Sequence, residues 1–320
     1  MINVIKMDLY RMVKNKATWL IFLASMLMMF ASIFMTSQDL AYYNSNPTAL
    51  QDLQANGDEV NWGIYIGSVK PEWCTGTEVP LMELVAVNVK SKLLLMFLVV
   101  FVTYFAGSEG RNGFLKNIAG QVTHKGIFVF SKSVVISIFA VMMIAGAVLA
   151  TMLGSVAFLG YINIANIGQG CVFLIVQILL HIAYGMFVLF LFNVTESSVA
   201  TMLAGILIAA GILQIVDAIL VSVFSKLHAI SDFSIMNYLT SGNVGLLSLD
   251  STSGLYIRAM LIEWIHCPIC GGKTRNKIRG DTELRNYPLY CPKCKKESLI
   301  DVKRLQVTVI KEPDAKTQSR

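Results

Sequence analysis

The chain has 320 residues, of which 55% are hydrophobic and only 14% are charged. An ordinary soluble domain carries about 25% charged residues, and one soluble globule cannot remove this much apolar surface from water. The composition therefore excludes a disordered chain, argues against a soluble enzyme over residues 1–259, and indicates a protein whose main solvent is lipid.

Charge and cysteine content divide the chain into two parts. Residues 1–259 contain 13 Lys and Arg and 13 Asp and Glu, whereas residues 260–320 contain 13 and 7, so the whole net charge of +6 belongs to the tail. Four of the six cysteines lie in the same basic tail. The sequence therefore predicts a membrane domain over residues 1–258 and a small separate domain over residues 259–320.

Five segments of the first part are long and apolar enough to cross a bilayer as helices, which takes about 20 residues. They cover residues 17–35, 93–107, 134–160, 171–192 and 199–224. The second run is short, so its helix is expected to begin upstream near Leu84, with Lys90 and Lys92 close to one membrane interface. The predicted fold class is mainly α: a polytopic helical membrane protein with five spans, followed by a small β domain.

The first 15 residues are amphipathic, because their apolar side chains fall at helical spacing on one face and their basic side chains lie elsewhere. Such a helix lies in the headgroup plane, and the alternative is a simple extension of the first span. We favour the interfacial helix because the four cationic residues up to position 16, Lys6, Arg11, Lys14 and Lys16, resist burial. No small-residue cleavage site follows the first span, so we expect this span to be a retained anchor.

Loop charges predict the orientation of the spans. Basic residues dominate before the first span and in residues 108–133, whereas residues 37–83 are acidic. The N-terminus and residues 108–133 are therefore predicted to be cytoplasmic, and residues 37–83 external, in a multi-pass protein of the cell membrane. Five inserted spans place the C-terminal domain outside, whereas a span that fails to insert leaves it in the cytoplasm.

Gln214 and Asp217 fall within the fifth predicted span, and His181 within the fourth. An ionisable group at membrane depth suggests a functional role, and a pair of His181 with Asp217 is conceivable. The alternative, which we favour, is that such groups hold the bundle together by interhelical hydrogen bonds.

Small residues in two spans predict close helix packing. Gly146, Ala150 and Gly154 recur every four positions in the third span, and Gly205 and Gly211 lie in the fifth. Residues of this size let helix backbones approach one another, so we interpret them as packing features rather than as sites.

Residues 107–133 read GSEGRNGFLKNIAGQVTHKGIFVFSKS. This stretch is too long for a tight connection and mixes glycine, charged and apolar residues. Two interpretations remain open: a loop that docks on a soluble partner, and a solvated linker.

Together with the basic amphipathic start, IKMDLYRMVKNKATWL, the stretch FAGSEGRNGFLKNIAGQVTHKGIFVFSK resembles the ABC-2 type permease subunits of ABC exporters. The resemblance extends over about residues 1–258. It implies a protomer of six helices that dimerises and binds separate ATPase subunits. It also implies a coupling surface for that ATPase formed by Glu109, Arg111, Lys116 and Lys125.

The chain departs from this family where a sixth span is expected. After the predicted outer loop, residues 225–256, only four uncharged residues separate Arg258 from Glu263. A segment that short cannot span a bilayer. The sixth helix is therefore replaced by the cysteine-rich tail.

Residues 266–294 read HCPICGGKTRNKIRGDTELRNYPLYCPKC, a C-x2-C-x20-C-x2-C pattern with both pairs in C-P-x-C form. Four thiolates in two chelating pairs suit tetrahedral zinc, and disulfides are the less favoured alternative. The predicted zinc ligands are Cys267, Cys270, Cys291 and Cys294. Because Gly271 after the first pair supplies the unusual backbone angles of a zinc knuckle, a small zinc ribbon is predicted.

The tail also resembles the cysteine-rich KTR proteins, through CPICGGKTRNKIRGDTELRNYPLYCPKC and the ending VIKEPDAKTQSR. This resemblance covers about residues 262–320 and implies a zinc-binding fold. The run Gly272-Lys273-Thr274 is not a nucleotide-binding loop, because Cys267 occupies the position that requires glycine. The basic residues of so small a domain form a solvated face, so nucleic acid is not expected as a partner.

The sequence thus supports two functions. The first is a membrane permease subunit of an ABC-2 type exporter, truncated and fused to a cysteine-rich KTR zinc-binding domain, with a separate ABC ATPase, a second permease copy and the lipid bilayer as partners. The alternative is a membrane-anchored zinc-ribbon binding module without transport activity. No catalytic constellation stands out, so the chain itself is not expected to be an enzyme.

Overall fold

The computed structural model describes residues 2–56, 64–75, 77–111, 126–213, 215, 240–247, 249, 263–266, 273–278, 284–290, 294–295, 297–303 and 306–309. The chain divides into two compact units, Met1–Leu249 and Asp250–Arg320. The predicted coupling residues Lys116 and Lys125 lie outside the described residues, as do Gln214, Asp217 and three of the four predicted zinc ligands.

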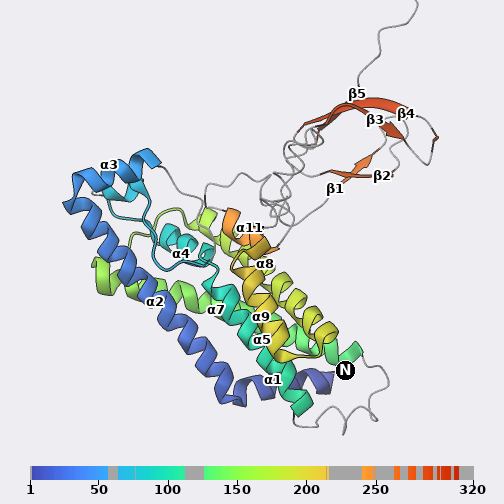
Figure 1. Ribbon diagram of the computed structural model, residues 1–320, viewed down its shortest axis with the longest axis horizontal. Coiled ribbons are helices and arrows are strands. Elements are labelled where there is room, and N and C mark those ends of the chain that lie inside the picture. Colours follow the sequence, from blue (N-terminus) through green and yellow to red (C-terminus); the bar gives the residue numbers. More distant parts are fainter. Residues whose placement is uncertain are drawn as a thin grey trace, which may run out of the picture. The chain divides into compact units, whose positions relative to one another are not determined.

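The first unit is built from helices (Figure 1). They are α1 (Ile2–Lys14), α2 (Lys16–Ser45), α3 (Pro47–Asn56), η1 (Pro71–Thr75), α4 (Leu81–Lys90), α5 (Leu93–Arg111), α7 (Gly126–Gly154), η2 (Ser155–Leu159), α8 (Ile167–Thr195), α9 (Ser198–Ala209) and α11 (Thr240–Leu246). Three of them are long and apolar enough to cross a bilayer: α2, α7 with its extension η2, and α8. The helices predicted over residues 17–35, 134–160 and 171–192 are therefore confirmed.

The second predicted span consists of two helices rather than one. α4 and α5 together pass the same length and composition test, which brings the candidate crossings to four, but they are bent by 53° at a short break. The fifth predicted span is helical over α9, and a turn follows at Ala210 and Gly211. Residues 216–224 lie outside the described part of the chain, so a fifth crossing stays a prediction.

The break between α4 and α5 lies at Lys92. This residue has a positive φ of 60°, which an α-helix cannot accommodate, so the helix stops and restarts around it. Ser91 closes the end of α4 by donating its hydroxyl to Asn88 O at 2.6 Å. Lys92 is only 2% exposed, so its side chain packs inside the bundle, and the expected position of Lys90 and Lys92 close to a membrane interface stays a prediction.

α1 is a helix of its own and not an extension of the first span. Asn15 leaves the helical conformation between the two helices, and its side-chain oxygen accepts a hydrogen bond from Ala17 N at 3.0 Å, which caps the start of α2. Trp19 of α2 donates Nε1 to Val13 O at 2.7 Å, near the end of α1. These two bonds fix the turn, and Figure 1 shows α1 leaving the direction of α2 at one end of the bundle.

The glycines of the third predicted span lie at a close helix contact, as the sequence predicts, and the structure shows that the partner is α2. A Cβ atom added to Gly154 of α7 would lie 3.0 Å from Ile33 Cβ, and one added to Gly146 would lie 2.5 Å from the sulfur of Met26. In the same way, Gly205 of α9 lies against Val99 of α5. Glycine at these positions allows the helix pairs to pack closely.

A buried polar bridge joins three helices. Asn88 of α4 accepts a hydrogen bond from Ser32 Oγ of α2 at 2.7 Å and donates Nδ2 to Thr151 Oγ1 of α7 at 3.1 Å. The backbone N–H of Gly67 donates to the same Ser32 hydroxyl at 3.0 Å. All of these side chains are buried, so the bridge supplies hydrogen-bond partners to polar groups that would have none in lipid. It also holds α4 between α2 and α7.

The second unit contains two antiparallel sheets. One pairs β1 (Glu263–His266) with β2 (Lys273–Ile278), and the other has the order β3 (Leu284–Tyr290), β4 (Glu297–Lys303) and β5 (Gln306–Val309). Within the described residues, β1 pairs with β2, β3 with β4, and β4 with β5, each in antiparallel fashion as in a hairpin, whereas β2 and β3 belong to different sheets (Figure 1). This small β unit agrees with the coarse prediction for the tail.

The contact between α2 and α7 yields a stability prediction. Substitution Gly154→Val should lower the free energy of unfolding by about 1–3 kcal/mol, because the added atoms meet Ile33 next to its backbone and cannot be accommodated by rotating a flexible side chain. The matched control is Gly168→Val in α8, where an added Cβ meets nothing within 4 Å. Thermal unfolding of both variants in detergent measures the difference, and equal effects would contradict the packing that we describe.

Candidate functional site

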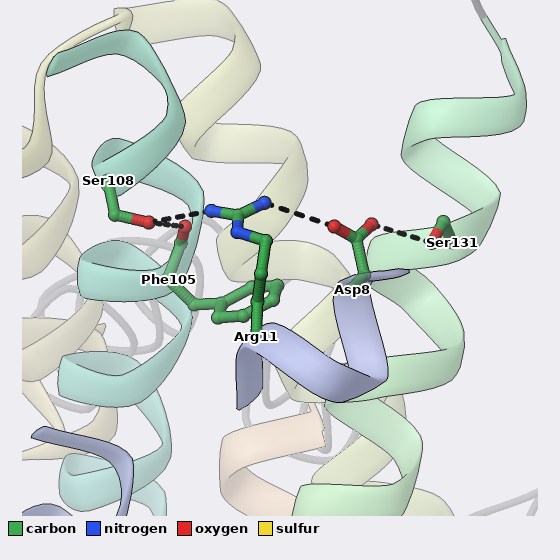
Figure 2. A network of polar contacts seen from close by, with 5 residues as sticks. All are labelled: Asp8, Arg11, Phe105, Ser108 and Ser131. Carbon is green, nitrogen blue, oxygen red and sulfur yellow. Dashed lines mark hydrogen bonds and ion pairs between the residues drawn. The ribbon is translucent and has the colours of Figure 1, made fainter. Parts of the chain in front are cut away.

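A network of polar contacts joins α1 to the ends of α5 and α7 (Figure 2). Asp8 of α1 is 1% exposed and accepts hydrogen bonds from Arg11 Nη1 at 3.0 Å and from Ser131 Oγ of α7 at 2.6 Å. The other guanidinium arm, Nη2 of Arg11, donates to Ser108 Oγ of α5 at 3.1 Å. The Arg11 guanidinium carbon also lies 5.2 Å from the centroid of the Phe105 ring, within reach of a cation–π contact.

The amphipathic pattern of α1 explains how one short helix can make these contacts. Asp8 and Arg11 are three residues apart, so they lie on neighbouring positions of the helix surface and can pair. Hydrogen bonds to charged groups each contribute about 1.5–3 kcal/mol, which is more than neutral ones do. The network therefore fixes α1 against both α5 and α7.

The position of this network is informative because α5 and α7 are the helices on either side of residues 112–125. Of the four predicted coupling residues, Glu109 and Arg111 belong to the last turn of α5, where the structure describes the backbone alone. Lys116 and Lys125 lie outside the described residues, so the coupling role of all four stays a prediction. The two helices from which this stretch emerges are nevertheless held together through α1.

Sequence reasoning missed the network itself. Asp8 is the single acidic residue among the first 16, where it stands among four basic ones. An isolated carboxylate of this kind is a signal for a buried ion pair, but Ser131, which bonds Asp8, and Ser108, which bonds Arg11, are about 100 or more residues away in the sequence. Only the fold brings them to α1.

The intramembrane residue His181 lies on α8 and is 1% exposed. Its Nδ1 lies 2.7 Å from Gln177 O in the preceding turn, whereas its Nε2 has no hydrogen-bond partner within the described part of the chain. The other two predicted members of this set, Gln214 and Asp217, lie outside that part. The pairing of His181 with Asp217 therefore stays a prediction.

In the second unit, the two cysteine pairs occupy equivalent positions in two hairpins. His266 at the end of β1 pairs with Lys273 at the start of β2, and Tyr290 at the end of β3 pairs with Glu297 at the start of β4. Each hairpin is thus closed by six residues, 267–272 and 291–296, and each closing segment begins with C-P-x-C. Two chelating pairs at two hairpin ends form the ligand set that a zinc ribbon requires.

The backbone after the second pair supports the knuckle interpretation. Lys295 has a positive φ of 56°, although non-glycine residues rarely adopt this conformation. Lys295 follows Cys294 as Gly271 follows Cys270, so it holds the same place after its pair as the glycine for which the sequence predicts unusual backbone angles, and Gly271 itself lies outside the described residues. Cys294 itself is half-buried, and Cys267, Cys270 and Cys291 lie outside the described residues.

Comparison with known families identifies this second unit in part. Residues 262–315 match the family described as Cysteine-rich KTR, so the tail contains a cysteine-rich KTR domain. Such a domain is compatible with metal binding. No ABC-2 permease family match is found, so the likeness of the first unit to permeases remains a resemblance. No curated protein and no solved structure matches the chain.

The strained position of Lys295 leads to a second prediction. The substitution Lys295→Gly should stabilise the β3–β4 hairpin by about 1 kcal/mol or less, since glycine adopts a positive φ without strain but loses more backbone entropy on folding. A change to glycine at Ser298, inside β4 and paired with Leu289 of β3, should be destabilising because glycine weakens a strand interior. Amide hydrogen exchange of β3 and β4 in the full chain measures both effects, and the same sign for both would contradict the prediction.

Proposed function

We propose that this chain is a membrane permease subunit of an ABC-2 type exporter, truncated before a sixth span and fused to a cysteine-rich KTR zinc-binding domain. The observation that carries the proposal is the Asp8–Arg11 network. It ties the amphipathic helix α1 to Ser108 and Ser131, on the two helices that flank residues 112–125.

A transporter that is driven by a separate ATPase must transmit a movement from its cytoplasmic loops to its membrane helices. Residues 112–125 belong to the stretch that resembles the coupling region of permeases. A movement of the ATPase that displaces this stretch would also displace the ends of α5 and α7. Because α1 is bonded to both ends, the three helices respond as one body rather than separately.

The predicted partners and location follow from this role. The partner is a separate ABC ATPase, contacted through Glu109, Arg111, Lys116 and Lys125, and the chain itself carries no catalytic activity. A second permease copy and the lipid bilayer complete the assembly. The protein is a multi-pass protein of the cell membrane, with its N-terminus and residues 112–125 in the cytoplasm, and with the KTR domain outside if five spans insert.

The cysteines of the KTR domain are proposed to bind one structural zinc ion. Cys267 and Cys270 belong to the β1–β2 hairpin segment, and Cys291 and Cys294 to the β3–β4 segment. Bound zinc joins the two hairpins, which are too small to be stabilised by an apolar core alone. The thiolates must be deprotonated to bind, so acidification favours release of the metal.

A second function is favoured by a different observation. The KTR match and the two equivalent hairpins describe a complete small domain, whereas the first unit has no family match. A membrane-anchored zinc-ribbon binding module without transport activity accounts for these facts with the helices as an anchor. This alternative predicts no contact with an ATPase.

The two functions are separated by photocrosslinking to a co-expressed ABC ATPase. A photoreactive residue placed at Glu109 or Lys116 should crosslink to the ATPase, whereas one placed at Tyr42, an exposed residue near the opposite end of α2, should not. Substitution Arg11→Met should weaken stimulation of ATP hydrolysis several-fold, because α1 then loses its ion pair and its bond to α5. Lys6→Met, at an exposed basic position of the same helix, is the matched control and should have no effect.

The absence of crosslinks from every position between 109 and 125 would favour the anchor function over the transporter. Crosslinks without any effect of Arg11→Met would leave the docking surface in place and would remove the network from the coupling mechanism.

Metal analysis of the purified full chain tests the zinc proposal. We expect one zinc ion per chain, lost in Cys267→Ser and in Cys291→Ser and retained in Cys171→Ser, which changes an exposed cysteine of the first unit. The two tail variants remove one ligand from each hairpin, and three thiolates hold zinc less tightly than four. Metal-free protein with intact disulfides between the tail cysteines would contradict the proposal.

A further inference from the structure

The break between α4 and α5 lies well inside a candidate membrane span. Eleven positions separate Lys92 from Leu81 at the start of α4, and sixteen separate it from Ser108 near the end of α5. A lysine that is 2% exposed at such a break is costly, and discontinuous membrane helices are a common setting for binding sites. The described residues offer this ammonium group no salt bridge.

The start of α5 adds further donors beside Lys92. The first N–H groups of a helix have no acceptor within that helix, and they carry the positive end of its dipole. Here they belong to Leu93, Leu94 and Leu95, which are at most 2% exposed. The break therefore presents an ammonium group and buried backbone donors, all of which suit a negatively charged group.

Two buried acceptors on α8 are unsatisfied. Gln177 is 0% exposed and donates Nε2 to Val244 O of α11 at 3.1 Å, but its Oε1 has no partner. His181 Nδ1 lies 2.7 Å from a carbonyl oxygen, which only accepts, so Nδ1 carries the proton and the unpartnered Nε2 is an acceptor. Across the described residues, three buried side-chain atoms lack a partner, and two of them are these neighbours on α8.

α11 lies against both Lys92 and Gln177, and His181 is one turn of α8 from Gln177. Gln177 is bonded to Val244, and a Cβ atom on the next residue, Gly245, would lie 3.1 Å from Cε and 3.8 Å from Nζ of Lys92. Lys92 from the α4–α5 break and Gln177 from α8 therefore contact two consecutive residues of α11.

We propose that this place, formed by Lys92, the start of α5, Gln177 and His181 and covered by α11, binds a solute that carries a carboxylate next to an N–H group, as the C-terminal end of a peptide does. Lys92 and the α5 amides bind the carboxylate, and Gln177 Oε1 and His181 Nε2 accept from the N–H group. α11 moves aside when the solute enters. The binding needs no ATPase, so it can succeed or fail independently of the proposed export function.

Equilibrium dialysis with the full chain in lipid nanodiscs tests the site directly. The probe is radiolabelled N-acetyl-alanyl-alanine, which has a free carboxylate and amide N–H groups, and its C-terminal amide is the uncharged control. We expect saturable binding of the acid, binding of the amide at least tenfold weaker, and no binding of either to empty nanodiscs. Equal binding of acid and amide, or no saturable binding of the acid, would overturn the proposal.

Matched variants assign the binding to this place. Lys92→Met should weaken binding of the acid at least tenfold, and Gln177→Leu several-fold, whereas Lys90→Met, two residues away on α4, should change it less than twofold. If Lys92→Met does not fold, Gln177→Leu and the comparison of acid with amide still decide the question. Binding that appears only in Asp217→Asn would show that the chain's own carboxylate fills the site, and would overturn the proposed ligand.

Discussion

The absence of water from a bilayer interior is the constraint on which the first unit depends. A polar group there has no partner except another group of the protein, so each buried one must be matched within the helix bundle. Asn88 meets this requirement by bonding Ser32 and Thr151, and in doing so it joins α4 to α2 and α7. Asp8 lies on α1, which is not one of the candidate spans, but it is buried as well and is matched by Arg11 and Ser131.

The same constraint makes buried polar groups without a hydrogen-bond partner informative about function. Where glycines let helices approach, as at Gly154 against Ile33, the bundle gains packing without any polar group. Around α11 the requirement is not met, because Gln177 and His181 keep unsatisfied acceptors and Lys92 lies buried at a helix break. A natural chain retains such costs where binding or transport uses them.

The second unit solves a different problem. Its strands form two small sheets, and a domain of this size has too little apolar surface to be stable through a core alone. The C-P-x-C segments occupy the ends of two hairpins, so a shared metal can replace the missing core. The membrane unit and the KTR domain therefore depend on different interactions, which agrees with the shift in charge and cysteine content between them.

The sequence by itself determined those features that depend on local pattern. Apolar runs located the long helices, small residues at every fourth position located a packing face of α7, and cysteine spacing located the KTR domain, because each signal lies within a few turns or one short segment. Only the tertiary structure decided that Asp8 meets Ser131, that Lys92 lies buried at a break, and that Val244 of α11 meets Gln177. These features depend on residues far apart in sequence. Their hydrogen bonds stabilise the protein only after folding has excluded water as a competing hydrogen-bond partner.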